Sequence, residues 1–417
     1  MNYEEAKKVL QMYGQEHILN SYERLNEEEK KKLLAQIETI DFEQILNLYE
    51  ETKKEIEFKD SKIEPIPAVN AETLSAEEKE KYRKIGEEII KSGKLAAVTM
   101  AGGQGTRLGH NGPKGTYDLG LPSHKSLFEI LCDGLKETMQ KYGTIVPWYI
   151  MTSRENNDET VAFFEKNNYF GYPKDGVGMF FKQGELPMID ESGKLIINEQ
   201  GLIKEAADGH GGIFESLYKS GALEDMKKRG VEWVFVGGVD NVLVKMADPM
   251  FIGFVACNNY MVASKTIIKA YPEEKVGVFC KKDGKPYVIE YTEISDEMAH
   301  EKNSNGDLTY GEAHMLLNLF NIKILDQIAN SKLPYHSAHK KCNFMNEKGE
   351  IIKAEKPNAY KFEAFIFDAF SLMPEIGLYR GKREEDFSPV KNAEGVDSPE
   401  TARRDYMKYH NIDSSAN

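Results

Sequence analysis

The sequence predicts an α/β fold built around a doubly wound, mostly parallel sheet. Three apolar segments have the length and composition of buried strands: LAAVTM (95–100), VPWYIMTS (146–153) and VEWVFVGGVDN (231–241). Two stretches of helical character, residues 126–142 and 212–230, lie between them. Strands that alternate with helices are typical of a parallel sheet covered by helices. Such sheets bind ligands beyond the carboxyl ends of their strands, so a site is expected there.

A helical region precedes this predicted core. Residues 1–60 are dense in Glu, Lys, Leu and Ile. Apolar residues recur there at helical spacing, namely Leu33, Leu34, Ile37 and Ile40. Farther on, Ser75 and Glu78 have the spacing of a capping box, which predicts a helix that runs to about Ile90.

Net charge and cysteine spacing argue against several classes of protein. The net charge of −14 argues against nonspecific binding to nucleic acid or to an anionic membrane, and leaves a locally basic pocket for a small anion open. The four cysteines have no CxxC spacing, so we expect free thiols of a reducing compartment. The N-terminus lacks an apolar signal segment, and no run approaches 18 apolar residues. We therefore expect a cytoplasmic protein without a membrane or nucleic-acid partner.

The glycine-rich segment AGGQGTRLG, residues 101–109, follows the first predicted strand. Glycines here let backbone N–H groups approach a ligand closely, and such an array suits phosphate. Arg107 adds a fixed positive group for phosphate oxygens. The glycine spacing GxGxxxG is one residue too long for the dinucleotide fingerprint, and no P-loop pattern is present. The glycines alone leave both a phosphate loop and a plain tight turn open.

Lys114 lies a few residues beyond this segment, between Pro113 and Gly115. Proline fixes the backbone and glycine removes bulk, so the lysine side chain can be directed inward. Most lysines are simply solvated. A lysine held in this way after a glycine-rich loop is better explained by contact with an anion.

Two further polar clusters are candidates for a site. In GGVDN (237–241), Asp240 ends a predicted strand, where a carboxylate can hold Mg²⁺ or can cap a turn. In ADGHGG (207–212), Asp208 and His210 precede a predicted helix, which indicates either an anion site or an Asx turn. Lys391 in FSPVKNAEG and Asp368 in KPNAYKFEAFIFD, taken alone, are ordinary structure.

Together these blocks closely resemble the signature of the eukaryotic-type UDP-sugar pyrophosphorylases, most closely the UDP-N-acetylhexosamine branch and more distantly the UDP-glucose branch. The resemblance spans residues 95–405 in the expected order. It implies a GT-A-like (Rossmann-like) nucleotidyltransferase core with a mixed, mostly parallel sheet. The expected organisation is a helical region at 1–90, a catalytic domain at 91–385 and a short C-terminal segment at 386–417.

The family couples UTP with a sugar 1-phosphate to give a UDP-sugar and pyrophosphate, reversibly and with Mg²⁺. By resemblance, the nucleotide-binding residues are Ala101, Gly102, Gly103, Gly105, Thr106, Gln183 and Gly211. The residues implied to contact the phosphates and to act in catalysis are Arg107, Lys114 and Lys391. The residues implied to bind the sugar are His210, Gly277, Glu290, Tyr291 and His314. The resemblance makes Asp240 the Mg²⁺ ligand, with Asp368 as a second candidate, and the metal would serve as Lewis acid and template.

Two departures from the family pattern bear on the sugar. The N-acetylhexosamine branch usually has a sugar-contacting asparagine where this chain has His210, and another where His314 aligns. The UDP-glucose branch commonly has histidine at the first of these positions. Lost amide partners in a buried site can decide specificity, so the two histidines favour glucose 1-phosphate or a related hexose phosphate. The alternative is a UDP-N-acetylglucosamine pyrophosphorylase.

A third departure concerns length, because the family usually continues well beyond the block at 401–410, whereas this sequence stops at Asn417. We therefore expect the family's C-terminal domain to be reduced or absent.

An alternative of another class is a non-catalytic UDP-sugar-binding protein on the same fold, since fold does not guarantee activity. The retained glycine loop with Arg107, Lys114, Asp240 and Lys391 argues against it. A dehydrogenase is excluded by the spacing of the glycines. The expected partners are UTP or UDP-sugar, sugar 1-phosphate and pyrophosphate, with Mg²⁺ as cofactor. The oligomeric state is left open.

Overall fold

The computed structural model describes residues 1–54 and 61–412. Residues 55–60 of the predicted N-terminal region and 413–417 of the predicted C-terminal segment lie outside the described residues. The chain forms two compact units. Unit 1 comprises Met1–Asp60, Gly184–Gly212 and Leu333–Phe365, and unit 2 comprises Ser61–Gln183, Ile213–Lys332 and Ile366–Asn417. The units do not follow the domain boundaries predicted at residues 90 and 385, which stay predictions.

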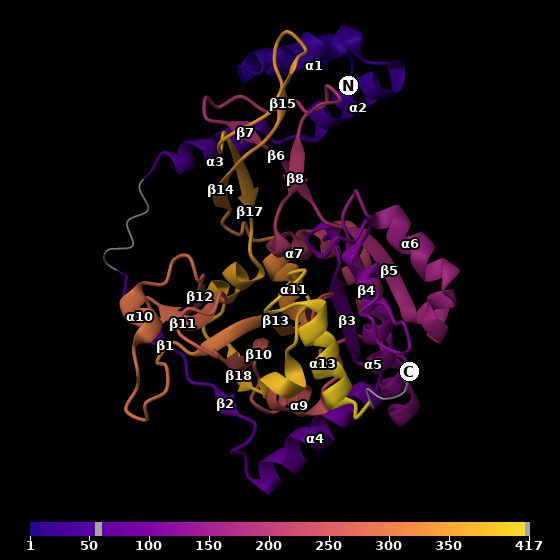
Figure 1. The fold of residues 1–417 in the computed structure, drawn as a ribbon, viewed down its shortest axis with the longest axis vertical. Helices are drawn as coiled ribbons and strands as arrows, with labels where there is room; N and C mark the ends of the chain where they lie inside the picture. Colours follow the sequence, from indigo (N-terminus) through magenta and orange to yellow (C-terminus); the bar gives the residue numbers. More distant parts are fainter. Residues whose placement is uncertain (55–60, 413–417) are drawn as a thin grey trace. The chain divides into compact units, whose positions relative to one another are not determined.

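Unit 1 joins N-terminal helices to short strands from two later parts of the chain (Figure 1). Its helical elements are α1 (Tyr3–Met12), the 3-10 helix η1 (Glu16–Arg24), α2 (Glu27–Thr39), α3 (Phe42–Thr52) and the 3-10 turn η6 (His210–Gly212). Its strands are β6 (Glu185–Pro187), β7 (Ile189–Asp190), β8 (Glu205–Ala207), β14 (His336–Lys340), β15 (Phe344–Met345), β16 (Ile351–Ile352) and β17 (Ala359–Glu363). The predicted helical face is confirmed at Leu33 and Ile37, which are buried in a core shared with Ile189 and Phe362.

Unit 2 is organised around a sheet that has 11 strands in the described residues. The main path runs in the order β2-β18-β10-β13-β9-β3-β4-β5, and β11 joins β12 and β1 to β13. These strands are β1 (Ile63–Pro65), β2 (Val69–Asn70), β3 (Leu95–Met100), β4 (Trp148–Thr152), β5 (Val177–Lys182), β9 (Trp233–Gly238), β10 (Val262–Ile268), β11 (Val278–Lys282), β12 (Lys285–Ile289), β13 (Glu312–Asn321) and β18 (Gly377–Arg380).

The sheet is mixed and mostly parallel along its main path, which confirms the predicted α/β class. Strand β3 lies between β9 and β4 and runs parallel to both. Strand β13 runs antiparallel to its neighbours β9 and β10. Met100, the last residue of β3, lies opposite Gly238, the last residue of β9. The loops that follow these two strands therefore leave the sheet at the same edge.

Helices of unit 2 connect and cover these strands. They are α4 (Ala76–Lys91), α5 (Leu127–Tyr142), α6 (Asn157–Lys166), α7 (Ile213–Lys219), α8 (Ala222–Lys228), α9 (Pro249–Cys257), α10 (Asp296–His300), α11 (Ile322–Ala329), α12 (Arg383–Asp386) and α13 (Pro399–Tyr409). Short 3-10 turns lie at η2 (Thr106–Leu108), η3 (Lys114–Thr116), η4 (Asn168–Gly171), η5 (Lys174–Gly176) and η7 (Ile366–Leu372).

Local sequence signals account for most helix ends. The capping box predicted at Ser75 and Glu78 is present at the start of α4. The helix predicted at 126–142 is confirmed as α5, with Ser126 as N-cap. The prediction of a single helix over 212–230 is wrong. Gly221 has a φ of 82° and divides the stretch into α7 and α8. A left-handed residue cannot continue a right-handed helix.

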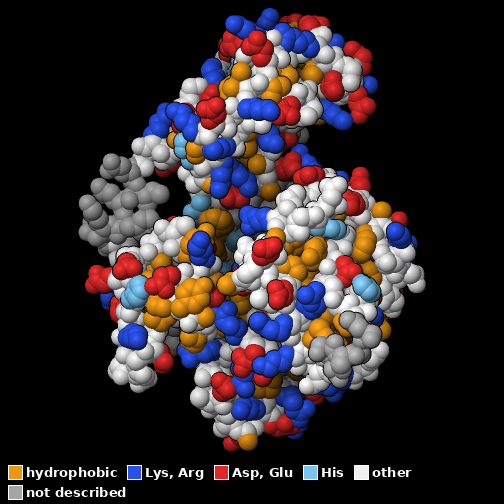
Figure 2. Space-filling view, in the orientation of Figure 1, with side chains coloured by type: hydrophobic (Ala, Val, Ile, Leu, Met, Phe, Trp, Pro, Cys, Tyr) orange, Lys and Arg blue, Asp and Glu red, His pale blue; other side chains and the backbone are white. Residues whose placement is uncertain are grey.

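The surface charges and the state of the cysteines agree with the predictions made from composition. Figure 2 shows acidic and basic side chains interspersed over the face drawn, without a continuous basic region. All four cysteines are free thiols, as predicted. Among the described residues, no helix has the length and apolar character needed to cross a membrane.

Helices α4 and α9 cross with their backbones in direct contact. A Cβ atom added to Gly253 of α9 would lie 1.8 Å from the carbonyl oxygen of Tyr82 in α4. A Cβ atom added to Gly86 of α4 would lie 1.8 Å from the carbonyl oxygen of Pro249. Backbone atoms cannot move aside as a flexible side chain can, so both glycines are required by packing.

We predict that Gly253→Ala lowers the free energy of unfolding by about 1–3 kcal/mol, because the added methyl group forces the two helices apart. The matched control is Gly134→Ala in α5, where an added Cβ meets no atom within 4 Å. That control is expected to stabilise the protein by up to about 1 kcal/mol, since alanine is the better helix former. Urea unfolding of both variants is the measurement, and equal midpoints would contradict the prediction.

Candidate functional site

The glycine-rich segment forms a loop directly beyond β3. Its base is closed by backbone bonds from Gly105 N to Gly112 O at 2.9 Å and from Lys114 N to Gly103 O at 3.0 Å. In the described part of the chain, the N–H groups of Gly102 and Gly103 donate to no protein group and remain available to a ligand. Arg107 is exposed on the short turn η2 in the same loop. Free N–H groups beside a guanidinium suit an anionic ligand such as a phosphate.

A side chain that sequence reasoning missed holds this loop in shape. Asn156 is fully buried, and its Nδ2 donates to the carbonyl oxygen of Ala101 at 3.0 Å and of Gly103 at 3.3 Å. These bonds occupy carbonyl groups of the loop and use none of its N–H groups. The only signal in the sequence is a polar residue shortly after a predicted strand, which is too common to identify a role.

Lys114 and Asp240 come together, as their predicted roles require. Lys114 Nζ lies 3.6 Å from Asp240 Oδ2, with the side chains 18% and 28% exposed. A Cβ atom on Gly115 would lie 2.1 Å from the ring of Phe128, so only glycine fits beneath the lysine. Val239 N donates to Met100 O at 3.1 Å, which fixes the segment with Asp240 beside the end of β3. Both groups therefore lie at the sheet edge that was expected to carry the site.

Gln183 lies against the glycine loop. It follows β5, and its N–H donates to Thr152 O at 2.7 Å. A Cβ atom added to Gly102 would lie 2.9 Å from Gln183 Oε1. The absence of a side chain at Gly102 thus leaves room for the glutamine amide, which resemblance assigns to the uracil.

Lys391 lies on a segment that pairs with the residues around Asp240. Val390 N donates to Asp240 O at 2.9 Å, and the side chain of Lys391 is 38% exposed. Lys391 Nζ lies 3.8 Å from Asp397 Oδ2, and Lys391 N donates to Asp397 O at 2.7 Å. The structure brings Lys114, Asp240 and Lys391 to one edge of unit 2.

Asp397 is an acidic residue near the site that sequence reasoning missed. Burial raises the pKa of its carboxyl group, and the negative charges of Glu274 and Asp240 add to the rise, while Lys391 opposes it. Its φ of 57° is a left-handed conformation that aspartate tolerates better than most residues. Asp397 therefore belongs to the electrostatic surroundings of Asp240 and Lys391.

Three of the predicted sugar-binding residues are neighbours within unit 2. His314 N donates to Gly277 O at 2.9 Å, and a Cβ atom on Gly277 would lie 3.2 Å from Glu290 Oε1. The imidazole of His314 meets three phenylalanine rings edge-on at 5.3–5.9 Å, those of Phe279, Phe367 and Phe370. Tyr291 is 45% exposed beyond the end of β12.

Asp368 is buried in the turn η7. Burial raises the pKa of Tyr287 on β12, and the negative charge of Asp368 contributes to that rise. Asp368 thus lies near the strand that leads to Glu290. Its predicted part in metal binding beside Asp240 stays a prediction.

His210 and Gly211 lie in unit 1 and are described with it. Gly211 N donates to Ala364 O at 2.8 Å, and a Cβ atom on Gly211 would lie 2.7 Å from the backbone of Ala364 and Phe365. The ring of His210 lies 5.3 Å from that of Phe365. Tight packing against the chain after β17 therefore accounts for this glycine-rich turn, and a role in binding stays a prediction.

Asp240 fits a magnesium ion better than a transition metal. Its carboxylate is partly exposed, and the described residues contain no group of three or more His, Cys, Asp or Glu side chains arranged to hold a metal. Mg²⁺ is bound through one or two carboxylates and completes its shell with water and phosphate oxygens. A metal at Asp240 would need a phosphate ligand, in agreement with the adjoining glycine loop and lysines.

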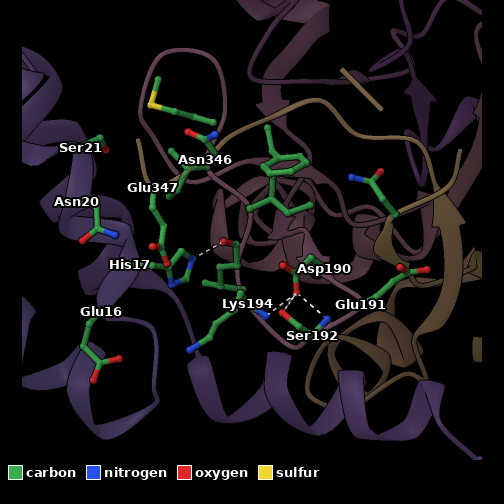
Figure 3. Close-up of a pocket in the computed structure, with 16 residues that line it drawn as sticks. Glu16, His17, Asn20, Ser21, Asp190, Glu191, Ser192, Lys194, Asn346 and Glu347 are labelled. Carbon is green, nitrogen blue, oxygen red and sulfur yellow. Dashed lines mark hydrogen bonds between the residues drawn. The ribbon is translucent and has the colours of Figure 1, made fainter. Parts of the chain in front are cut away.

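Unit 1 contains a separate cavity of about 860 Å³ between η1, the turn after β7 and the β15 region (Figure 3). Its polar groups largely serve the local fold. Asp190 Oδ1 accepts bonds from the N–H groups of Ser192 and Lys194. His17 Nε2 donates to Leu195 O at 2.7 Å, and burial lowers the pKa of this histidine. The predicted site residues do not line this cavity.

Comparison with known proteins gives a consistent result over almost the whole chain. A family model described as UTP–glucose-1-phosphate uridylyltransferase matches residues 40–396. UDP-N-acetylglucosamine diphosphorylase 2 of Arabidopsis thaliana is 40% identical over 423 residues, which cover 96% of this chain and 82% of that protein. UDP-N-acetylglucosamine pyrophosphorylase of Saccharomyces cerevisiae is 36% identical, covering 97% of this chain and 89% of that protein.

A solved structure shares the architecture. The uridine diphosphate N-acetylglucosamine pyrophosphorylase of Trypanosoma brucei, crystallised with an inhibitor, superposes with a TM-score of 0.83 at 31% identity. The match covers 97% of this chain and 84% of that one.

We predict that Gly102→Ala weakens the binding of UTP, the nucleotide implied by the resemblance, by about tenfold, because the methyl group displaces the Gln183 amide. Calorimetric titration with UTP is the measurement. Gly134→Ala, which lies on an open helix face away from this loop, should bind UTP like the unmodified protein. Unchanged affinity in Gly102→Ala would show that Gln183 does not contact the nucleotide.

Proposed function

This chain belongs to the UDP-sugar pyrophosphorylase family, and we propose that it makes UDP-N-acetylglucosamine and pyrophosphate from UTP and N-acetylglucosamine 1-phosphate. As a member of this family it is a uridylyltransferase, that is, a nucleotidyltransferase. The choice of sugar is the proposed part. One observation carries it: relatives named for UDP-N-acetylglucosamine align with this chain at 36–40% identity over at least 96% of its length.

The arrangement at the sheet edge supports this reaction. A sugar phosphate oxygen attacks the α-phosphorus of UTP, and pyrophosphate leaves. Little covalent chemistry falls to the protein, so catalysis depends on alignment and on stabilising negative charge. The N–H groups of Gly102 and Gly103 receive the nucleotide, while Lys114 and Lys391 oppose the charge of the phosphates. Gln183 holds the uracil.

Asp240 is proposed to hold Mg²⁺, with Asp368 as a second candidate ligand. When bound, the ion acts as a Lewis acid on the phosphate oxygens. Lys114 Nζ already lies 3.6 Å from the Asp240 carboxylate, so a phosphate that binds here would meet positive charge from the lysine on the same side.

Glucose 1-phosphate is the second candidate for the sugar substrate. The histidines at positions 210 and 314 favour it, because family members that use the N-acetylated sugar usually have asparagine there. His314 also lies beside Gly277 and among three phenylalanine rings, which leaves less polar surface for an acetamido group. The names of the relatives support the N-acetylated sugar better.

We predict that pyrophosphate release from UTP is faster with N-acetylglucosamine 1-phosphate than with glucose 1-phosphate or galactose 1-phosphate, by at least about tenfold in kcat/KM. The three sugars are compared in parallel in a coupled pyrophosphate assay. Asp240→Ala is expected to lose activity with all three sugars. Preference for glucose 1-phosphate would select the second candidate, and binding of UTP without turnover of any sugar would indicate a non-catalytic protein.

We also predict that removal of Mg²⁺ with EDTA stops pyrophosphate release and that excess Mg²⁺ restores it. Asp240→Asn should raise the Mg²⁺ concentration needed for half-maximal rate by about tenfold or more, because a neutral amide is a poorer ligand than a carboxylate. Initial rates over a Mg²⁺ titration are the measurement. A rate that is insensitive to EDTA would rule out the metal requirement.

A further inference from the structure

Asp240 and Lys391 lie 151 positions apart in the sequence, yet their separation in space is set by one short pairing of backbone segments. The residues around Asn241 form an antiparallel bridge with the residues around Pro389. Val390 N donates to Asp240 O at 2.9 Å, and Val242 N donates to Ser388 O at 3.2 Å. Any slip of this pairing would move Lys391 relative to Asp240.

The backbone alone supports this pairing poorly. Pro389, at the centre of the bridge, takes no part in these two bonds, which its neighbours Val390 and Ser388 make. A ladder of two bonds between irregular segments is weak, because the entropy lost in ordering the chain opposes it. Another group must hold the register.

The carboxamide of Asn241 supplies the missing bonds. Its Nδ2 donates to Asp386 O at 2.8 Å, and its Oδ1 accepts from Ser388 N at 2.9 Å. Oδ1 also accepts from Leu243 N at 3.2 Å, which ties the side chain to its own loop. Asn241 is only 3% exposed, so water does not compete for these bonds.

The segment to which Asn241 bonds, residues 386–388, is held to the sheet through Asp386. Lys265 of β10 lies 2.7 Å from Asp386 Oδ1 and 2.5 Å from Asp248 Oδ2. Burial alone would lower the pKa of Lys265, but the two carboxylates raise it above its ordinary value, so the lysine stays charged. Ser388 Oγ donates to Asp405 Oδ2 in α13 at 2.9 Å. Asn241 therefore connects the loop of Asp240 to a segment that is fixed on both sides.

The geometry points to Asn241 as a positioning residue that acts through Lys391: its carboxamide sets the register in which the Lys391 amine faces the phosphate site beside Asp240. Asn241 touches neither substrate nor metal in this role. The inference rests on the proposed function, because Lys391 matters only if phosphates bind at this edge.

The test is a double-mutant cycle of the unmodified protein, Asn241→Ala, Lys391→Ala and the double variant. We expect Asn241→Ala to lower kcat about thirtyfold in the unmodified background and less than about threefold in the Lys391→Ala background. The reason is that a misplaced lysine cannot matter once the lysine is gone. A purely structural role would give the same fold-loss in both backgrounds, and that result would overturn the inference.

Asn318→Ala is the matched control for the loss of a buried asparagine. Asn318 is fully buried in β13, and its Oδ1 accepts from Ser264 Oγ at 2.9 Å. This variant should lower the melting temperature and keep kcat within about twofold. If Asn241→Ala does not fold, Asn241→Ser replaces it in the cycle, because serine adds no charge and is too short to bond both Asp386 O and Ser388 N.

The same cycle is read a second time by UTP affinity, which needs no turnover of sugar. Coupled losses of affinity support the inference even if the proposed sugar is wrong, and additive losses overturn it. If Lys391→Ala changes neither kcat nor UTP affinity, the inference is overturned through its premise, while turnover of N-acetylglucosamine 1-phosphate by the unmodified protein would still support the proposed function.

Discussion

The parallel pairing of β3 with β9 is the constraint on which the site depends. Met100 lies opposite Gly238, and Val239 N donates to Met100 O at 3.1 Å. These two strands come from parts of the sequence more than a hundred residues apart. Because parallel strands end at the same edge of a sheet, their aligned ends bring the glycine loop and Lys114 to Asp240. Without this strand pairing, Lys114 and Asp240 would not be held near each other.

Polar side-chain bonds fix a second segment of the site, which lies outside the strands of the large sheet. The chain from Asp386 to Lys391 belongs to no strand of the large sheet, yet it is held by a buried lysine on one side and by the Asn241 carboxamide on the other. Such polar anchors are directional, whereas apolar packing tolerates small slips. Directional bonds suit the proposed function, in which the Lys391 amine faces phosphate oxygens at a defined distance.

Much of this could be predicted from residue patterns. Apolar runs followed by glycines predicted β3 and β9, and Lys114 between Pro113 and Gly115 was expected to point inward. The ring of Phe128 beneath Gly115 explains why that glycine is needed. Asn156, Asn241 and Asp397 could not be found this way, because single polar residues in loops carry no periodicity. Their partners are carbonyl and N–H groups far away in the sequence, which only the folded chain brings near.

The sequence by itself determined the strand segments, the capped helices and the family, because these follow from local periodicity, from turn chemistry and from the order of motifs. It also predicted Lys114, Asp240 and Lys391 as charged groups of a nucleotide site. The tertiary structure alone decided that 212–230 is two helices and that Lys114 lies 3.6 Å from Asp240. It alone showed that the segment of Lys391 pairs with that of Asp240, and that the Asn241 carboxamide bonds to Asp386 O and Ser388 N. These are results of long-range pairing, in which the energy of a contact depends on residues that no local window of sequence contains.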